Sequence, residues 1–360
     1  MPGGAGMIYH TPGHGIVTDA LILQGVLKLL HLSNNLEGVV ENIGGRYVID
    51  VPYALDLSYV PGWELYEWLK IAVDRGVYVG KIRELFESAI DINGFKSWAV
   101  KFLDALSDLP RDFDLSEQHK EGKREGRSKA RRKSMYTLYL PISSVYGKFA
   151  GEEYRLREEP YLVCATCFAL ATIGYIYGAL KVRVDGRDGY TIFNFTFVPQ
   201  SKMKIRDMLI LQRLGGLTRF RRRTASSLST PGALVYALSA GETLYATGER
   251  PMVITWVTER SGNNQRAHRP SILDVNPLLS FIAELKLRVP RWPRIARFLA
   301  ENEPVALNTL GEYVLFGGDV YMVIRQLYTA IESAAKKQGR SETFAEAMKD
   351  ISTALLENMR

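Results

Sequence analysis

The sequence has few of the residues that build small secreted folds. Only two cysteines, Cys164 and Cys167, and five histidines occur among its 360 residues. Two cysteines cannot form a disulfide framework, and no basic, apolar leader with a small-residue cleavage site opens the chain. We therefore expect the protein to reside in a reducing cytoplasm.

Long uncharged runs are also scarce. One segment, residues 161–180, has no charged residue over roughly the length of a bilayer span. Its two threonines, its three tyrosines and the acidic residues Glu158 and Glu159 just before it are not typical of a membrane span. The segment favours a buried central helix, and we expect no membrane association.

Recognisable catalytic motifs are missing as well. Neither a Gly-x-Ser-x-Gly elbow nor a His-Glu-x-x-His helix is present. Asp274, Glu284 and Lys286 follow the order found in many metal-dependent nucleases, where carboxylates hold the metal ion and lysine positions the attacking water. Residues 278–287 have helical spacing, however, whereas such a pair normally leaves a strand. We expect no enzyme activity, with a metal-dependent nuclease as an alternative.

Two groups of residues have the composition of partial metal sites. Cys164 and Cys167 are spaced like half a zinc site or a redox pair, but structural zinc needs four ligands. His10, His14 and Asp19 are grouped around a glycine-rich loop. The backbone conformation of such a loop explains Gly13 and Gly15 equally well, and capping explains Asp19. We predict two small buried cysteines and neither a metal nor a cofactor, although a metal at the cysteines stays open.

The composition is that of a globular protein, with 46% hydrophobic and 24% charged residues. The patterning predicts a helix-dominated α+β fold, with antiparallel strands and hairpins in the N-terminal and central regions and a helical C-terminal part. We expect a mixed α+β domain over residues 1–270 and a helical domain over residues 271–360. Residues 110–134 lose almost all apolar side chains, which predicts a mobile basic loop within the first domain.

Local patterns place individual elements. A helix is expected over residues 16–31, and a hairpin is expected from strands at 181–184 and 190–198. Further helices are expected at 200–214 and 231–246, separated by a Gly/Ser/Thr-rich connection. A strand at 252–257 then leads into a polar, exposed loop.

The net charge of +7 says little, but its distribution says more. Residues 120–133 carry eight basic and two acidic residues, residues 202–223 eight and one, and residues 286–297 five and none. These three stretches sum to +18 and leave −11 on the rest of the chain. Focused charge of this kind is expected in a protein that neutralises the phosphates of a nucleic acid.

We assign a distinct role to each basic stretch. The first is expected to be a mobile arm that orders on binding. Within the second, residues 219–223 are expected to be a clamp on a connection, with Phe220 available to stack on a base. The third is expected to be a rail along one side of a helix, because its arginines recur every three residues. Solvated loops and contact with an acidic partner protein are the alternatives. The candidate residues are Lys120, Lys123, Arg124, Arg127, Lys129, Arg131, Arg132, Lys133, Arg219, Arg221, Arg222, Arg223, Arg288, Arg291, Arg294 and Arg297.

A fourth group has side chains suited to reading base edges. Asn263, Asn264, Gln265 and Arg266 follow the strand expected at 252–257 and form the densest group of this kind in the chain. They are a candidate specificity loop. An ordinary polar hairpin turn explains the same residues equally well.

The opening residues carry a family resemblance. Residues 9–21, Tyr-His-Thr-Pro-Gly-His-Gly-Ile-Val-Thr-Asp-Ala-Leu, and Gly-Val-Leu at 25–27 resemble the start of archaeal CRISPR-associated large subunits of type I-A, the Apern subtype. The Cys-x-x-Cys helix at 164–178, residues 231–238 and the chain length extend this resemblance.

The resemblance implies a non-catalytic subunit of an RNA-guided Cascade surveillance complex in antiviral defence. Such a subunit binds CRISPR RNA and target DNA, recognises the motif that flanks the target and helps to recruit a helicase-nuclease. The other Cascade subunits are then its protein partners. A purely structural assembly subunit is the remaining alternative.

Overall fold

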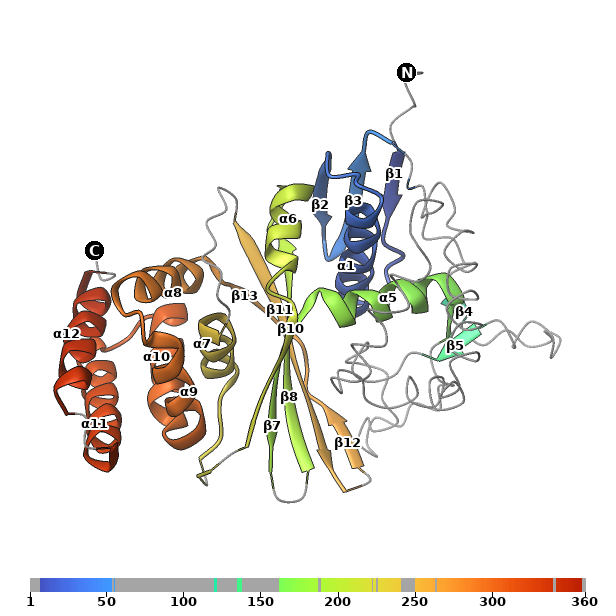
Figure 1. The fold of residues 1–360 in the computed structure, drawn as a ribbon. Coiled ribbons are helices and arrows are strands. Elements are labelled where there is room, and N and C mark those ends of the chain that lie inside the picture. The colour runs from blue at the N-terminus through green and yellow to red at the C-terminus, as the bar shows by residue number, and fades with distance from the viewer. Residues whose placement is uncertain are drawn as a thin grey trace.

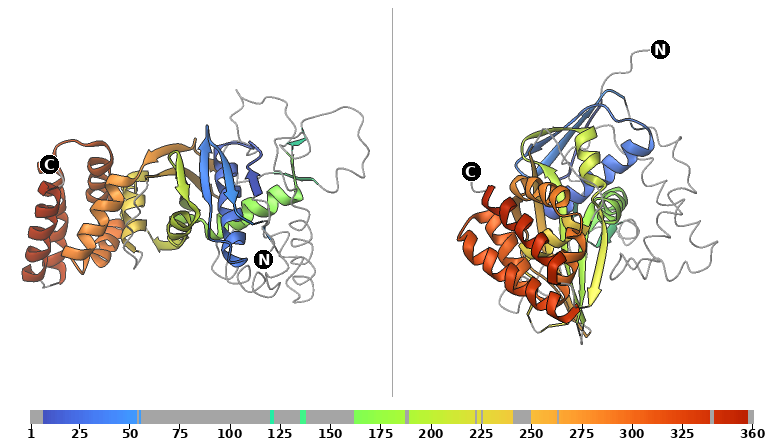
Figure 2. Two further views of the ribbon diagram at one scale, coloured as in Figure 1. Left: turned by 90° about the horizontal axis from the view of Figure 1, so that it is seen from above. Right: turned by 60° about the vertical axis from the view of Figure 1, so that its left-hand side comes forward.

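A computed structural model describes residues 7–53, 55, 120–121, 135–137, 162–186, 189–221, 223–224, 226–240, 250–262, 264–338 and 341–357. In this part of the chain a six-stranded sheet lies at the centre, with helices on both of its faces (Figures 1 and 2). The predicted helix-dominated α+β class, with antiparallel strands and a helical C-terminal part, is confirmed.

The central sheet has the order β10-β7-β8-β11-β12, with β13 also paired to β11. All of its pairs are antiparallel except β10 with β7, which are parallel. The predicted hairpin is confirmed as β7 and β8. The strands are β7 (Ala179–Asp185), β8 (Gly189–Pro199), β10 (Gly216–Arg221), β11 (Pro251–Ser261), β12 (Asn264–Ala267) and β13 (Ser271–Asp274).

A smaller, four-stranded antiparallel sheet with the order β1-β3-β2-β9 lies beside the central one (Figure 1). Its strands are β1 (Met7–His10), β2 (Val39–Ile43), β3 (Arg46–Val51) and β9 (Lys202–Lys204). A third sheet has the order β4-β6-β5 and consists of β4 (Lys120–Glu121), β6 (Leu162–Cys164) and β5 (Met135–Thr137). The helices between these sheets are α1 (Ile16–Leu32), α5 (Ala165–Tyr177) and α6 (Ile205–Gln212).

The uncharged run forms a buried helix, as predicted, but a shorter one. It divides into β6, α5 and the start of β7, because the backbone returns to an extended conformation at Ala179. Among the described residues no helix is both long and apolar enough to cross a bilayer.

Helices α1 and α5 cross in direct backbone contact, which two glycines allow. A Cβ atom at Gly174 of α5 would overlap the carbonyl oxygen of Leu21 in α1. A Cβ atom at Gly25 of α1 would overlap the carbonyl oxygen of Leu170 in α5. Both helices are buried almost throughout, so this crossing lies inside the core.

The buried side chain of Gln24 ties the crossing to the rest of the fold. Its Nε2 donates to the carbonyl oxygen of Phe197 in β8, at 2.7 Å. Gln212 of α6 donates from Nε2 to the main-chain oxygen of Gln24 at 2.7 Å and to its Oε1 at 2.9 Å. Gly178, just after α5, leaves the space that the Gln24 side chain occupies. One amide therefore joins α1, α5, α6 and the central sheet.

A fully buried lysine in β7 caps the C-terminal end of α5. Lys181 Nζ donates to the carbonyl oxygens of Tyr175 at 2.5 Å and Ile176 at 3.2 Å, and it lies 4.6 Å from the centre of the Tyr175 ring. These carbonyls belong to the last turn of α5, where main-chain acceptors have no partner within the helix. Burial lowers the pKa of Lys181 to about 7.

On the other face of the central sheet, on the left of Figure 1, the described residues form a group of six helices that extends away from the sheet. Helix α7 lies next to the sheet, and Gly232 in α7 allows close contact with Asn308 of α10. Trp292 of α9 is buried and donates from Nε1 to Ser239 Oγ of α7 at 2.8 Å. The helices are α7 (Thr230–Ala240), α8 (Asn276–Arg288), α9 (Trp292–Asn302), α10 (Pro304–Phe316), α11 (Val320–Gln338) and α12 (Ser341–Glu357).

The domain boundary at residue 270 stays a prediction. Strand β13, which follows it, pairs with β11 in the central sheet and leads directly into α8.

We expect Gly174→Ala to destabilise the fold by about 3 kcal/mol, because the added methyl group forces α1 and α5 apart. This loss exceeds the gain of about 1 kcal/mol that alanine brings to a helix interior. The free energy of unfolding in urea measures it. Gly216→Ala is the control, since a Cβ there meets nothing within 4 Å. Stability equal to that of the wild type in Gly174→Ala would contradict the crossing.

We expect Lys181 to make stability rise with pH above about 7. Between its folded pKa of about 7 and its ordinary value of 10.5, the unfolded chain holds a proton that the folded chain has released. Relative to Lys181→Met, the free energy of unfolding of the wild type should increase by up to about 1.4 kcal/mol per pH unit in this window.

Urea unfolding at pH 7.5, 8.5 and 9.5, values inside this window, measures the difference. The lost hydrogen bonds of Lys181→Met add an offset that does not depend on pH. The exposed Lys349→Met is the control and should follow the wild-type profile. Parallel profiles of the wild type and Lys181→Met would show that Lys181 stays protonated when folded.

Candidate nucleic-acid interface

Four arginines share one face at one end of the central sheet. Arg219 of β10 lies opposite Arg183 of β7, and Arg221 lies opposite Asp185. Arg260 of β11 lies opposite Tyr190 of β8, which in turn pairs with Asp185. Because alternate residues of a strand share a face, these side chains lie on the face that Lys181 presents to α5. We call Arg183, Arg219, Arg221 and Arg260 the arginine face.

Contacts within the arginine face hold two of its members in place. Asp185 accepts from Arg183 Nε at 2.8 Å and from Arg219 Nε at 2.5 Å. The Arg183 guanidinium also stacks 4.0 Å from the centre of the Tyr190 ring. Partial burial raises the pKa of Asp185, but the hydrogen bonds from Arg219 and Arg183 outweigh it and the pKa is lowered. The carboxylate therefore stays ionised, and Arg219 remains 61% exposed.

The prediction that the arginine cluster at 219–223 lies on a connection is wrong for Arg219, Phe220 and Arg221, which form part of β10. Strand alternation turns the two arginines outward and Phe220 inward. Phe220 is only 4% exposed and packs edge-on against Tyr236 of α7, with ring centres 5.1 Å apart. It is core and does not stack on a base. Arg222 lies outside the described residues.

Glu301 of α9 joins the second and third basic stretches. Its carboxylate lies 3.4 Å from Arg223 and 3.0 Å from Arg297, and its own side chain is only 13% exposed. The main-chain N–H of Arg223 also donates to the Glu301 carbonyl oxygen. Two segments that are distant in the sequence thus meet beside the end of β10.

The predicted rail of four arginines on one helix is wrong for Arg288. This residue ends α8, where it pairs with Glu284 of α8 at 2.7 Å and with Glu357 of α12. The chain leaves the helix at Val289, before Pro290, because proline cannot continue a helix. The other three arginines recur along α9 and are exposed: Arg291 at its N-cap, Arg294 and Arg297. We call these three the α9 row.

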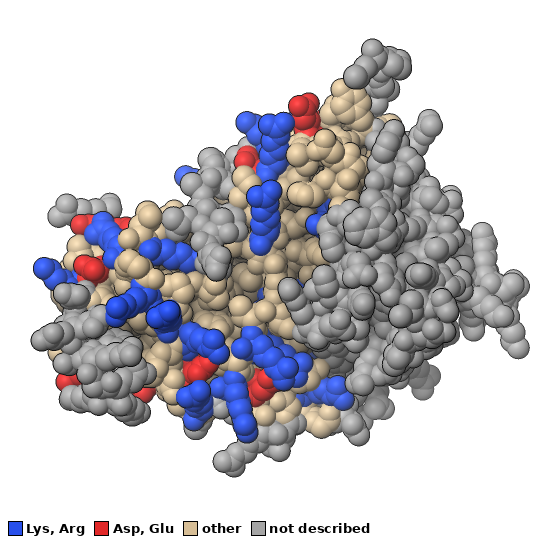
Figure 3. Space-filling view, viewed as in Figure 1, with Lys and Arg blue, Asp and Glu red and all other residues tan. Residues whose placement is uncertain are grey.

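The charged surface matches this arrangement. Figure 3 shows Lys and Arg side chains in a band from the C-terminal helices to the lower ends of the sheet strands, with a few acidic groups among them. A separate basic group lies above it, over the region of α6 and β2. The remaining basic residues of the second stretch, Lys202, Lys204, Arg206 and Arg213, are exposed on or beside β9 and α6. The residues of the second basic stretch therefore contribute to two separate surfaces.

Three of the four candidate specificity residues lie in a strand rather than in the predicted loop. Asn264, Gln265 and Arg266 belong to β12, where they pair with Ser261, Arg260 and Glu259 of β11. The backbone forms a hairpin because Gly262 takes a left-handed conformation, with φ 56°. Asn263 lies outside the described residues. The hairpin places β12 directly beside Arg260.

Of the first basic stretch, the structure describes Lys120 and Glu121. Lys120 lies in β4, opposite Val163 of β6. Its other members, Lys123, Arg124, Arg127, Lys129, Arg131, Arg132 and Lys133, lie outside the described residues, as does most of the loop expected at 110–134. The mobile arm stays a prediction.

The glycine-rich loop before α1 is organised by a buried carboxylate. Asp19 accepts from the main-chain N–H of Gly13 at 2.7 Å and of Gly15 at 2.9 Å. Both glycines have positive φ, 83° and 111°. Burial raises the pKa of Asp19, although the hydrogen bonds from the loop oppose the shift. Asp19 thus caps the loop by accepting from its main-chain N–H groups, and this role accounts for the carboxylate here. Within the described part of the chain, no group of three or more His, Cys, Asp and Glu residues has an arrangement that would hold a metal ion.

The two cysteines form a helix cap. Cys164 is the N-cap of α5, and its Sγ accepts from the Cys167 N–H at 3.4 Å. The contact with Cys164, together with burial, holds the pKa of Cys167 well above its ordinary value. Metal ligation needs a thiolate, which this environment disfavours. The predicted burial is confirmed for Cys167, whereas Cys164 is half-buried.

The residues of the nuclease alternative make separate local contacts. Asp274 accepts from the main-chain N–H and the side-chain amide of Asn276, at 3.0 and 2.5 Å. Glu284 lies more than two turns further along α8, about 12 Å from Asn276 at the usual helical rise, and pairs with Arg288. Burial lowers the pKa of Lys286, which also lies on α8.

Sequence comparison identifies the family. Residues 7–353 match the model of a family described as CRISPR-associated protein (Cas_Csa4). The chain belongs to this family. The CRISPR system associated protein Cas8 of Thermoproteus tenax is 43% identical over 359 residues, covering 95% of this chain and 97% of the relative. The CRISPR-associated protein Cas8a2/Csa4 of Methanocaldococcus jannaschii is 23% identical over 304 residues, covering 78% of this chain and 76% of the relative. The resemblance to archaeal type I-A large subunits is confirmed.

Sequence reasoning missed Arg183, Arg260 and Tyr190, which lie outside the three basic stretches. The available signal was strand alternation: Lys181, Arg183 and Asp185 occupy every second position of the predicted hairpin, so their shared face was readable. Their contact with β10 and β11 depends on strand order, which the sequence did not reveal.

Proposed function

We propose that this Cas8-family chain is the non-catalytic large subunit of a type I-A surveillance complex in the cytoplasm, and that it binds CRISPR RNA and target DNA through the arginine face and the α9 row. The observation that carries this proposal is the convergence of arginines from β7, β10 and β11 on one sheet face. Glu301 holds Arg223 and the α9 row together beside the end of β10, the strand that carries Arg219 and Arg221.

The carboxylates within the surface support phosphate binding. Asp185 and Glu301 each bind two arginines, which fixes the guanidinium groups before any ligand arrives. A guanidinium has five N–H donors, so one contact to a carboxylate leaves others for phosphate oxygens. Arginines held in this way lose little side-chain entropy on binding. Basic residues without such supports would provide charge without a fixed geometry.

The β11–β12 hairpin is the part of this surface that we assign to the motif flanking the target. A two-stranded ribbon fits the major groove of DNA, where each base pair presents its own pattern of donors and acceptors. The hairpin begins beside Arg260, so phosphate contacts at the arginine face would set its position on the duplex.

Contacts with other subunits and with the helicase-nuclease belong to the same proposal. Tyr321 and Tyr328 are 71% and 55% exposed on α11. This helix lies at the end of the molecule away from the central sheet (Figure 1). Exposed aromatic side chains are enriched where proteins meet. We assign these contacts to the helical C-terminal part.

Replacing Arg219, Arg221 and Arg260 together with alanine should flatten the salt dependence of nucleic-acid binding. Each lost phosphate contact reduces the slope of log K against log salt by about 1, so the slope should fall by about 3. Fluorescence anisotropy with duplex DNA over a salt series measures it.

The matched control replaces Lys202, Lys204 and Arg206, which removes the same charge from the surface at β9 and α6. Equal slopes for the two triple variants would reject the arginine face as the binding surface. A wild-type chain that ignores DNA and RNA at low salt, yet co-purifies with partner subunits, would instead favour a purely structural assembly subunit.

Replacing Asn263, Asn264 and Gln265 with alanine should change which flanking sequence the assembled complex accepts. Overall affinity should change little, because these side chains carry no charge. Binding to a library of targets with randomised flanks measures the preference, and Arg325→Ala on α11 is the control. Equal losses on every flanking sequence would argue against base reading by this hairpin.

A further inference from the structure

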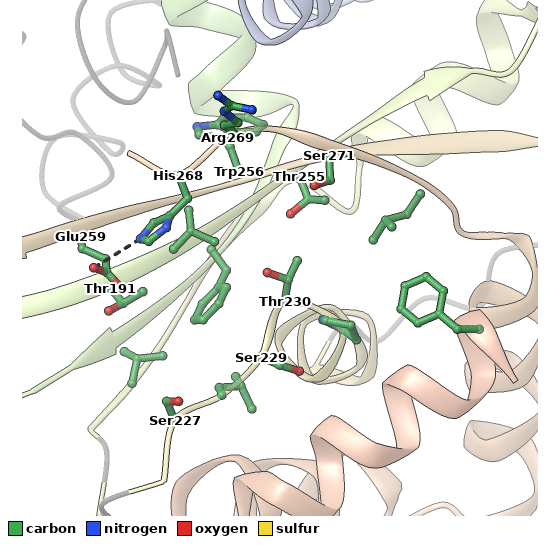
Figure 4. A pocket seen from close by; sticks show the side chains of 17 residues that line it. Thr191, Ser227, Ser229, Thr230, Thr255, Trp256, Glu259, His268, Arg269 and Ser271 are labelled. Atoms are coloured by element: carbon green, nitrogen blue, oxygen red, sulfur yellow. Dashed lines mark ion pairs between the residues drawn. The ribbon is translucent and has the colours of Figure 1, made fainter. Parts of the chain in front are cut away.

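A pocket lies on the opposite face of the same sheet end, between the sheet and the segment that leads into α7 (Figure 4). Its volume is about 510 Å³, within the range of roughly 300–1,000 Å³ typical of small-molecule sites. One wall comes from β7, β8 and β11, and the facing wall comes from residues 227–231 and the end of α10.

The pocket has apolar surfaces suited to a flat ligand. Phe193, Val257 and Leu228 contribute to its walls, and Phe316 at the end of α10 completes them. Phe316 is unusual because its side chain is 66% exposed although it borders a cavity. An exposed aromatic ring at the edge of a pocket offers a face on which a planar ring stacks.

Hydroxyl groups supply most of the polar lining. Thr255 of β11 and Thr230 of α7 lie on opposite sides of the pocket, and Thr191, Ser227 and Ser229 lie along it (Figure 4). A hydroxyl group both donates and accepts hydrogen bonds. Such a lining matches a ligand whose edge alternates donors and acceptors, which is the pattern of a nucleobase.

Charged groups are confined to one end of the pocket. His268 Nε2 lies 3.4 Å from Glu259 Oε2, and Arg269 points away from the other lining residues in Figure 4. Arg266 of β12 is exposed and pairs in register with Glu259, so strand alternation places both on the pocket face. An exposed cation therefore lies on the pocket face of the sheet, next to Glu259 of the pocket lining.

The wall that faces the sheet is fixed before any ligand binds. Asn308 of α10 accepts from the Ser229 N–H at 2.8 Å and donates to the Ser227 carbonyl oxygen at 3.0 Å. Ser229 Oγ in turn accepts from the Gly232 N–H in the first turn of α7. A pocket held in this way needs little reordering to take a ligand.

We infer that this pocket takes the base of one nucleotide, with apolar groups against the faces of the base, hydroxyl groups along its edge and Arg266 at the phosphate. The inference rests on the proposed function, because the arginine face lies on the reverse of the same strands. A single strand whose phosphates follow that face reaches the pocket by passing round the end of the sheet. An unstacked base then enters it. A free mononucleotide has the same chemistry.

The experiment compares two oligonucleotides of about 12 residues, one with bases and one with an abasic backbone throughout. The wild-type chain should prefer the strand with bases by about 5- to 150-fold, the range expected for stacking of a base on an aromatic side chain. Phe316→Ala should lose most of this preference and bind the abasic strand as the wild type does. Thr255→Val should reduce the preference by removing one hydroxyl group.

Tyr53→Ala is the matched control, because Tyr53, just after β3, is an aromatic residue of similar exposure (60%) that does not line the pocket. It should keep the wild-type preference. Calorimetry with AMP, GMP, CMP and UMP identifies the source of the nucleotide: binding that depends on Phe316 and matches that of the strand would assign the pocket to a free nucleotide.

Wild-type binding of the strand and of all four mononucleotides by both Phe316→Ala and Thr255→Val would overturn the inference. Failure of the proposed function gives a different result. In that case the wild type ignores both strands at low salt, while the mononucleotides still report on the pocket.

Discussion

The backbone contact between α1 and α5 is the constraint on which the rest of the fold depends. Gly25 and Gly174 remove the side chains that would separate the two helices, and Gln24 then comes within hydrogen-bonding distance of β8 and α6. A buried amide without partners would be costly, so the helices, the sheet and α6 are stable only together. Lys181 of β7 adds to this arrangement by capping the C-terminal end of α5.

Much of the fold was accessible from the sequence where the pattern is local. The hairpin of β7 and β8, helix α1 and the buried position of α5 follow from hydrophobic spacing and turn residues. The errors arose where one short segment supports two interpretations. Arg-Phe-Arg at 219–221 is a basic cluster when read for charge and an amphipathic strand when read for alternation. Only the core position of Phe220 decides between them.

The binding surface was predictable only in part, because it is made by strand order and helix ends. A spacing of three residues indicates one helical side, yet Pro290 ends the helix between Arg288 and Arg291. Glu301 brings Arg223 and Arg297 together across more than seventy residues of chain, and no local pattern records that contact. Charge counting located the basic segments, whereas the sheet decides which of their members face the same way.

The two faces of strand β11 contribute to different surfaces. Glu259 lines the pocket, and the next residue, Arg260, belongs to the arginine face. Point substitutions alter one side at a time. An insertion or deletion of a single residue before Glu259 would exchange the two sides, because side chains alternate with a period of two. The length of this strand is thus constrained more tightly than its composition, and variation within the family should take the form of substitutions here and of length changes in the connecting loops.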